Sequence, residues 1–151
     1  MGITLTETKF NNEILKNNEL VILPNGYESD NNSTEFLSSS ISLVKVIKKK
    51  LPAKLLCDPT ALIELREASW LAPAILLTLN LMNENPDAIN FLIDALLDSL
   101  KKHSQPSVEK GIKIDLYCES ASGKVIKLNY DGDNKGLIEI KGIIEQVMHE
   151  K

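Results

Sequence analysis

The sequence contains few of the residue types that carry out chemistry. It has two cysteines, two histidines and a single tryptophan. Cys57 and Cys118 lie far apart and beside apolar residues, which predicts two buried free thiols in a reducing compartment and no disulfide. Neither cysteine forms the paired spacing of a zinc site with His103 or His149. We therefore expect no bound metal.

Sequence motifs for catalysis are also missing. The chain has no nucleotide-binding P-loop, no Gly-x-Gly-x-x-Gly fingerprint and no nucleophile elbow. The segment 131–142 begins like a calcium loop, with Asp131 and Asp133 at the first and third positions. However, Lys135 occupies the fifth position and Gly142 the twelfth, where a bidentate glutamate is needed. We expect no cofactor and no enzymatic activity.

The charge balance and the amino-terminal residues indicate where the protein works. The net charge is −4, so no overall positive field attracts nucleic acid, and we expect none as a partner. The first ten residues, MGITLTETKF, lack the basic and apolar regions of a secretory signal. These features predict a cytoplasmic protein.

The most apolar stretch, SWLAPAILLTLNLM at residues 69–82, is shorter than the ~20 residues that a membrane helix needs. Extending it toward the amino terminus adds Arg66 and two glutamates, each costing about 3 kcal/mol at the bilayer centre. We therefore consider membrane insertion unlikely and expect protein to cover this stretch. That protein is the chain's own core or a partner.

The length of 151 residues predicts a single domain, 1–151. Residues 1–32 are polar and partly irregular, with short strands around Ile3 and Leu5 and at 19–23, and with a turn at Pro24-Asn25-Gly26. The segment 107–151 predicts a β-hairpin and a helix. The segment between them, 33–103, predicts mainly helix.

Three helices are expected in this middle segment. From Ser33 to Leu51 the apolar residues recur at helical spacing with a cap at Asn32 or Ser33, although the β-branched cluster would also suit a strand. Asp58-Pro59 is a helix-start signal and Pro73 interrupts the pattern, so 60–82 predicts either a kinked helix or two helices that meet near Ser69. Residues 86–103 form a clear amphipathic helix.

Beyond Pro106 the apolar spacing changes from helical to alternating. Residues 112–118 and 125–130 alternate as the two strands of a hairpin, and 137–150 predicts a final amphipathic helix. The short link at 83–85 suggests that Leu71–Met82 and 86–103 pack as a helical hairpin. The expected fold is α+β: a helical hairpin packed with a β-hairpin and a C-terminal helix, plus short N-terminal strands.

The apolar helix expected at 70–82 has more apolar surface than one contact can cover, which leaves a side for a partner protein. Trp70 and Tyr117 are candidate anchors on the surface, although Trp70 could also be buried at the kink. The expected partner-binding residues are Trp70, Leu71, Ile75, Leu79 and Tyr117.

The order of these features resembles one family, the effector-associated constant component family of bacterial NTPase-centred conflict systems. The resemblance covers residues 60–150. It rests on the apolar helix expected from Trp70 to Met82, the amphipathic helix that ends in basic residues, here Phe91 to Lys102, the lysine-bearing hairpin and the last helix. No catalytic signature belongs to this pattern. The resemblance implies a noncatalytic adaptor in an antiphage defence complex, with a defence effector or NTPase as its protein partner.

The functional expectation is therefore a binding component that couples an effector to a partner through apolar helical surface. Homo-oligomerisation is compatible with the same surface. The alternative is a small effector whose helix 70–82 disrupts membranes after oligomerisation. A partner retained on purification would favour the first, and leakage of liposomes the second.

Overall fold

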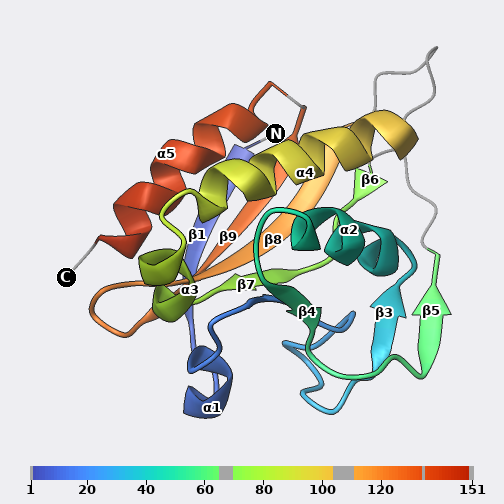
Figure 1. Cartoon of the computed structure of the whole chain (residues 1–151), viewed down its shortest axis with the longest axis horizontal. Helices are drawn as coiled ribbons and strands as arrows, with labels where there is room; N and C mark the ends of the chain where they lie inside the picture. Colours follow the sequence, from blue (N-terminus) through green and yellow to red (C-terminus); the bar gives the residue numbers. More distant parts are fainter. Residues whose placement is uncertain (1, 65–69, 104–110, 134, 150–151) are drawn as a thin grey trace.

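A mixed β-sheet organises the chain. The computed structural model describes residues 2–64, 70–103, 111–133 and 135–149. The strands of the sheet follow each other in the order β1-β9-β8-β7-β2-β4, and the short β6 pairs with β8 beside this path. Figure 1 shows β1, β9, β8 and β7 in succession across the sheet. The bounds of the strands are β1 Gly2–Thr8, β2 Leu20–Ile22, β4 Ala53–Leu55, β6 Trp70–Leu71, β7 Ile75–Leu77, β8 Ile112–Glu119 and β9 Val125–Gly132.

The β8–β9 hairpin is the longest pairing in the sheet and confirms the alternating pattern of the sequence. The strands run antiparallel, with Leu116 opposite Leu128. Gly123 has φ of 87° in the connecting turn, a left-handed conformation that glycine adopts without a steric penalty. Its N–H donates to Ser120 O at 2.9 Å. β1 continues this antiparallel arrangement on the outer side of β9, whereas β7 runs parallel to β8.

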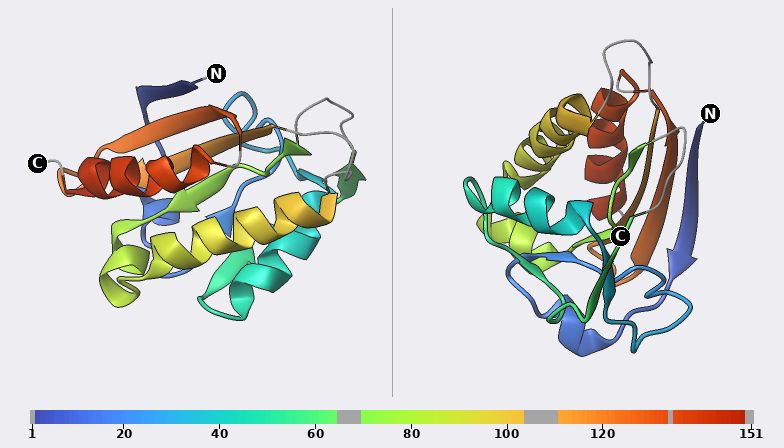
Figure 2. Two further views of the ribbon diagram at one scale, coloured as in Figure 1. Left: turned by 90° about the horizontal axis from the view of Figure 1, so that it is seen from above. Right: turned by 90° about the vertical axis from the view of Figure 1, so that its right-hand side faces the viewer.

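Helices cover one face of the sheet. The helices on this face are α2 (Ser39–Lys48), α3 (Leu79–Glu84), α4 (Ala88–His103) and α5 (Leu137–Met148). Figure 2 shows α2, α4 and α5 on the same side of the strands, and α4 packs against both α2 and α5. Their apolar stripes meet the inward side chains of β7, β8 and β9 in one large apolar cluster. This contact buries the amphipathic faces predicted at 86–103 and 137–150.

The opposite face is covered only in part. A second, smaller apolar cluster lies there, formed by Val21, Leu23, Leu76, Tyr117 and Val125. The segment between β1 and β3 (Glu35–Leu37), which includes the single-turn α1 (Asn12–Leu15), packs over it. The remaining side chains of β8 and β9 on this face are polar. The open face is therefore the face on which the sheet presents polar side chains.

The helix expected at 60–82 is wrong for most of its length. Ala61–Ile63 forms β5, which pairs with β3 in a small parallel sheet, and the apolar stretch forms β6 and β7. Residues 65–69 lie outside the described residues. Ile75–Leu77 is a central strand with every side chain buried, and a short apolar run buried on both faces has the same composition as a buried helix segment. Pro73 falls between β6 and β7 and interrupts a strand, not a helix.

The helical hairpin expected from 71–82 and 86–103 does not form, because its first arm is divided among β6, β7 and a short helix. Between β7 and α4 only the short α3, Leu79–Glu84, is helical, so α4 has no long helical partner at 71–82 and packs against α2 and α5. Thr78 caps α3, because its Oγ1 accepts the Leu81 N–H at 3.1 Å. The described residues of the segment 33–103 also include the short strands β3 to β7 besides the three helices.

The helix favoured at 33–51 starts later than predicted. Glu35–Leu37 is a strand, so Phe36 and Leu37 belong to β3 and the cap at Asn32 or Ser33 does not form. The helix begins at Ser39 after Ser38. Its β-branched residues are tolerated because tertiary burial outweighs local propensity.

The α+β class is confirmed, together with the N-terminal strand and the C-terminal helix. The turn at Pro24-Asn25-Gly26 is also confirmed: Gly26 has φ of 73°, and the Tyr27 N–H donates to Pro24 O at 3.2 Å. No helix among the described residues is long and apolar enough to span a bilayer.

Candidate functional site

A cleft opens on the face of the sheet that the helices leave uncovered. Its volume is about 320 Å³, and it lies between the loop that follows β2 and the strands β8 and β9. We call it the sheet-face cleft. Its apolar wall includes Leu23, Pro24, Leu37, Leu71, Pro73 and Ala74, and its polar groups come from Glu28, Lys113, Asp115, Tyr117 and Asn129.

The turn after β2 brings Glu28 to the cleft. Gly26 reverses the chain, and the loop is then held closed by the Asn25 N–H, which donates to Glu35 O at 2.7 Å. The Ser33 hydroxyl donates to Asn25 O at 2.8 Å. These hydrogen bonds offset part of the conformational entropy that a polar loop loses when it becomes ordered. They place the Glu28 carboxylate above β8 and β9.

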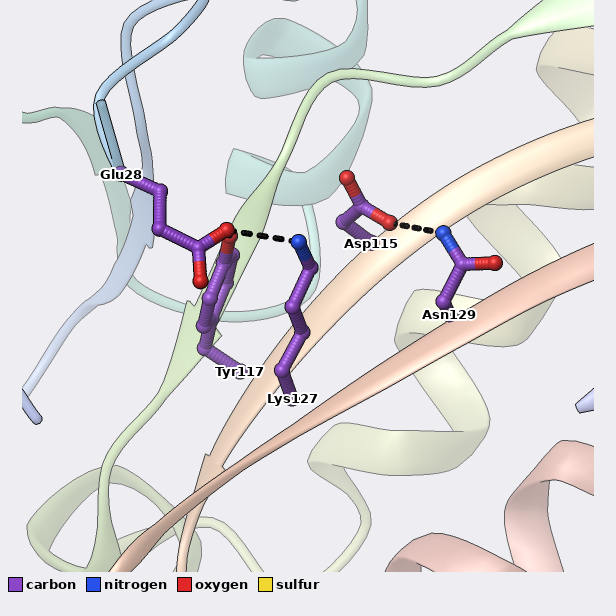
Figure 3. Close-up of polar contacts among 5 residues, drawn as sticks. All are labelled: Glu28, Asp115, Tyr117, Lys127 and Asn129. Atoms are coloured by element: carbon purple, nitrogen blue, oxygen red, sulfur yellow. Dashed lines mark hydrogen bonds and ion pairs between the residues drawn. The ribbon is translucent and has the colours of Figure 1, made fainter. Parts of the chain in front are cut away.

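Glu28 joins a cross-strand pair. Lys127 and Tyr117 stand opposite each other on β9 and β8, and both point toward the loop (Figure 3). Lys127 Nζ lies 2.6 Å from Glu28 Oε2, and the Tyr117 hydroxyl donates to the same oxygen at 3.1 Å. The Tyr117 ring also packs against Phe10, with the ring centroids 5.0 Å apart. One carboxylate oxygen thus ties the loop to two strands.

A second polar pair lies beside the first. Asn129 Nδ2 donates to Asp115 Oδ1 at 2.5 Å across the hairpin, and in Figure 3 Lys127 stands between this pair and Glu28. Asn129 is exposed and Asp115 half-buried. Both side chains can therefore be reached from the cleft. The Asn129 amide can donate a hydrogen bond to a bound group, and the oxygens of both side chains can accept hydrogen bonds from it.

The charges in the cleft perturb one another in consistent directions. The Lys127 ammonium is the main cause of a lowered pKa for Glu28, and Glu28 in turn raises the pKa of Lys127. Burial, and then the negative charges of Glu28 and Asp115, raise the pKa of Tyr117 well above its ordinary value of 10.0. Tyr117 therefore remains a neutral phenol at physiological pH. Its role is to donate a hydrogen bond.

The cleft brings together two of the five residues expected to bind a partner. Leu71 is partly exposed and lies in the wall, and Tyr117 lies in the floor. The expectation of Tyr117 as an exposed anchor is wrong, because only 3% of it is exposed and its ring belongs to the smaller apolar cluster. The Trp70 backbone pairs with Ile112, while its side chain lies outside the described residues.

The other two expected residues lie elsewhere. Ile75 is completely buried in β7, so it offers no surface to a partner. Leu79 is partly exposed and lines a groove of about 390 Å³ beside α3 and the end of α5. Met82, Pro86, Ile89 and Met148 supply most of its apolar lining. The single apolar surface expected at 70–82 is thus divided among the cleft, the core and this groove.

The thiols do not contribute to the cleft. Both cysteines are free; Cys118 is buried, and Cys57 is only partly buried, which corrects the expectation of two buried thiols. Burial raises the pKa of Cys118 to about 12, so it stays a protonated, unreactive thiol. Within the described ranges, no three His, Cys, Asp or Glu side chains come together as a metal site.

Sequence reasoning missed Glu28, Asp115, Lys127 and Asn129. The alternation of the hairpin places Asp115 and Tyr117 on the same face and Lys127 and Asn129 on the return strand. Glu28 carries no such signal, because it lies 89 residues before Tyr117 in a polar loop. Comparison of the chain with protein-family models, curated proteins and solved structures gives no match.

Proposed function

We propose that this protein is a noncatalytic adaptor that binds a segment of a partner protein in the sheet-face cleft. The observation that carries the proposal is the composition of the cleft, in which an apolar wall faces both hydrogen-bond donors and hydrogen-bond acceptors. Binding sites generally combine apolar lining with a few convergent polar groups. With about 320 Å³, the cleft is at the small end of the usual range of roughly 300–1,000 Å³ for ligand pockets. This volume suits one or two side chains of a protein segment.

The preferred segment follows from the groups in and beside the cleft. Glu28 and Asp115 carry negative charges, whereas Lys113 and Lys127 carry positive charges. Because these charges balance, a strongly charged segment gains little from the cleft. An apolar side chain can pack against Leu71, and a neutral amide or hydroxyl group can bond to the floor. We expect binding that depends weakly on salt.

The proposed biological setting is a bacterial antiphage defence complex, with an effector or NTPase as the partner. The support for it is the part of the resemblance that remains, which is the order of amphipathic helix, lysine-bearing hairpin and last helix from residue 88 onward. The apolar helix that the resemblance implies at 70–82 does not form, because this stretch is divided among β6, β7 and α3. The helix that the membrane-disrupting alternative requires at 70–82 does not form, since Ile75–Leu77 is a buried strand of the sheet. That alternative therefore has no observation in its favour.

A blocking substitution in the cleft tests the proposal. The partner is first identified by affinity capture from the native host and purified, and its dissociation constant is then measured by calorimetry. Asn129→Arg places a long side chain in the cleft and can still donate to Asp115, so the fold is retained. We expect affinity for the partner to fall at least about tenfold, or about 1.4 kcal/mol.

The matched control is Ile138→Arg. Ile138 is 65% exposed on α5, on the helix side of the sheet. The control variant should bind within about twofold of the unmodified protein. If both variants bind equally well, or if no partner from the host binds the purified protein, the cleft is not the docking site and the proposal fails.

A further inference from the structure

The two edges of the sheet differ in how they are protected. Exposed edge strands present unpaired N–H and C=O groups, and proteins usually protect them with short strands, prolines or lysines. β4 follows this rule, because it is a three-residue strand with Lys54 at its centre. β1 does not follow it. It is seven residues long, and its sequence GITLTET contains no proline, lysine or arginine.

The outer side of β1 is open to another strand. β9 occupies its inner side along the whole length, from Gly2–Asp131 to Thr8–Val125, and no described strand pairs with its outer side. Leu5 is 50% exposed, and among the described residues only two other large apolar side chains, Leu62 and Ile138, are exposed to this degree. Next to it lies a hollow of about 240 Å³ whose lining includes Ile126, Ile143 and Val147. An exposed edge next to apolar surface is a site for strand addition.

We propose that β1 pairs with β1 of a second copy of this chain, in an antiparallel, two-fold symmetric dimer. Side chains alternate along β1, with threonines on the open face and Ile3, Leu5 and Glu7 on the helix face. A two-fold axis through Thr4 places Ile3 of one copy opposite Leu5 of the other. Both apolar pairs then lie on the helix face, next to the hollow.

The register follows from avoiding the buried charge. Axes through Leu5 or Thr6 would place Glu7 opposite Ile3 or Leu5, which pairs a carboxylate with an apolar side chain. The Thr4 axis leaves Glu7 beyond the paired segment and places Thr4 opposite Thr4. This self-complementary pattern favours a second copy over an unrelated strand, because an interface on a two-fold axis must match itself.

The dimer would continue the sheet from one copy into the other. The two-fold axis of an antiparallel strand pair stands perpendicular to the sheet, so the helix layers of both copies fall on one side. Both sheet-face clefts fall on the other side. If the proposed function holds, the dimer presents two clefts to one partner, which raises the apparent affinity through effective concentration. The dimer itself does not depend on that function.

Sedimentation velocity of the purified chain tests the dimer without any partner. An interface built on one strand pair is small and belongs to the weak class, so the protein should be compared from about 5 to 500 µM. We expect a concentration-dependent shift from monomer to dimer. A protein that remains a monomer over the whole range overturns the proposal.

Charge substitutions at the axis test the register. Thr4→Lys and Thr4→Glu each place like charges opposite each other in the dimer, and each should weaken self-association at least about tenfold at low salt. Both substitutions are at one exposed position of an edge strand, so the fold should persist. Mixing the two variants places Lys opposite Glu and should restore the dimer. No rescue on mixing would rule out the Thr4 axis.

Leu5→Lys and Leu62→Lys form the matched pair for the apolar contact. Leu62 is 54% exposed on β5, away from the main sheet, and closely matches Leu5 in exposure. Leu5→Lys should abolish the dimer, whereas Leu62→Lys should leave it unchanged. Equal effects of both would mean that association is nonspecific and would overturn the proposal. None of these outcomes involves the cleft, so the proposed function is tested separately.

Discussion

The two faces of the sheet use the same strands for different purposes. On the helix face, side chains from every long strand join α2, α4 and α5 in one large apolar cluster. On the open face, a small apolar cluster lies beside the polar groups of the sheet-face cleft. Adjacent residues of one strand therefore belong to different environments: Leu77 to the first and Leu76 to the second.

This difference shows how a small domain can combine a stable core with a face on which polar groups stay accessible. The helix face supplies buried apolar area, which is the main favourable contribution to folding. The open face needs only enough packing to hold the loop that carries Glu28. Polar groups can then remain partly exposed without weakening the core. Three experiments sharpen or break this comparison.

The largest expected effect comes from truncating the two adjacent leucines of β7. Both are completely buried. Leu77→Ala should lower the free energy of unfolding by about 3–5 kcal/mol, because the dense cluster cannot collapse around the cavity. Leu76→Ala should cost about 2–3 kcal/mol, since the loop and α1 can move inward. Urea unfolding of both variants measures the difference; a larger cost for Leu76→Ala would contradict the comparison.

An intermediate effect is expected from two glycines at α5, the helix that covers β9. A methyl group at Gly136 would collide with the Tyr130 hydroxyl, which is held by donating to Asp133 O at 2.6 Å. Gly136→Ala should therefore cost about 1–3 kcal/mol. Gly142 has no atom near its outward position within the helix, so Gly142→Ala should add up to about 1 kcal/mol. Thermal unfolding tests both variants: the melting temperature should fall for Gly136→Ala and rise for Gly142→Ala.

The smallest effect is the pH dependence of the Glu28 contact on the open face. The pKa of Glu28 is lowered in the folded protein, so its contribution is present above the ordinary value of about 4.5 and is lost as the pH falls through the folded value. Because the side chain is 42% exposed, the loss should stay below about 1 kcal/mol. Glu28→Gln should flatten the stability profile in this acidic window. An unchanged profile would show that Lys127 does not stabilise the loop.

Periodicity predicted the parts of the chain where one face is apolar and the other polar. The hairpin, α4 and α5 all have such a pattern, and their bounds differ from the expected ones by only a few residues. In each case the local pattern and the final burial agree. The turn at Pro24–Gly26 was predicted equally well, because proline fixes φ and glycine adopts the positive φ that the turn needs.

Periodicity failed where residues are buried on both faces. Ile75–Leu77 has no polar side to reveal its period, so it was assigned to a helix. Asp58-Pro59 strengthened this error, because an aspartate and a proline also begin turns before strands. For β3, three residues were too few to separate a strand from the start of α2. Ile75–Leu77 became a strand because β8 and β2 were available to pair with β7, and Glu35–Leu37 became one by pairing with β5.

The candidate site was predictable only in part. The alternation of the hairpin places Asp115, Tyr117, Lys127 and Asn129 on one face, although nothing in the sequence reveals what covers them. Tyr117 was selected for partner binding but was expected to be exposed. It is buried because Phe10 and Glu28, both distant in the chain, pack or bond against it.

The sequence by itself determined the alternating hairpin, the two amphipathic helices that follow and precede it, and the scarcity of chemically reactive residues. These features depend on periods of a few residues and on composition. Only the tertiary structure decided that the apolar stretch at 70–82 is the middle of a sheet, that Glu28 meets Lys127, and that β1 is an open edge. Each of these depends on contacts between segments far apart in the chain, and the local sequence pattern of one segment does not indicate which distant segment it contacts.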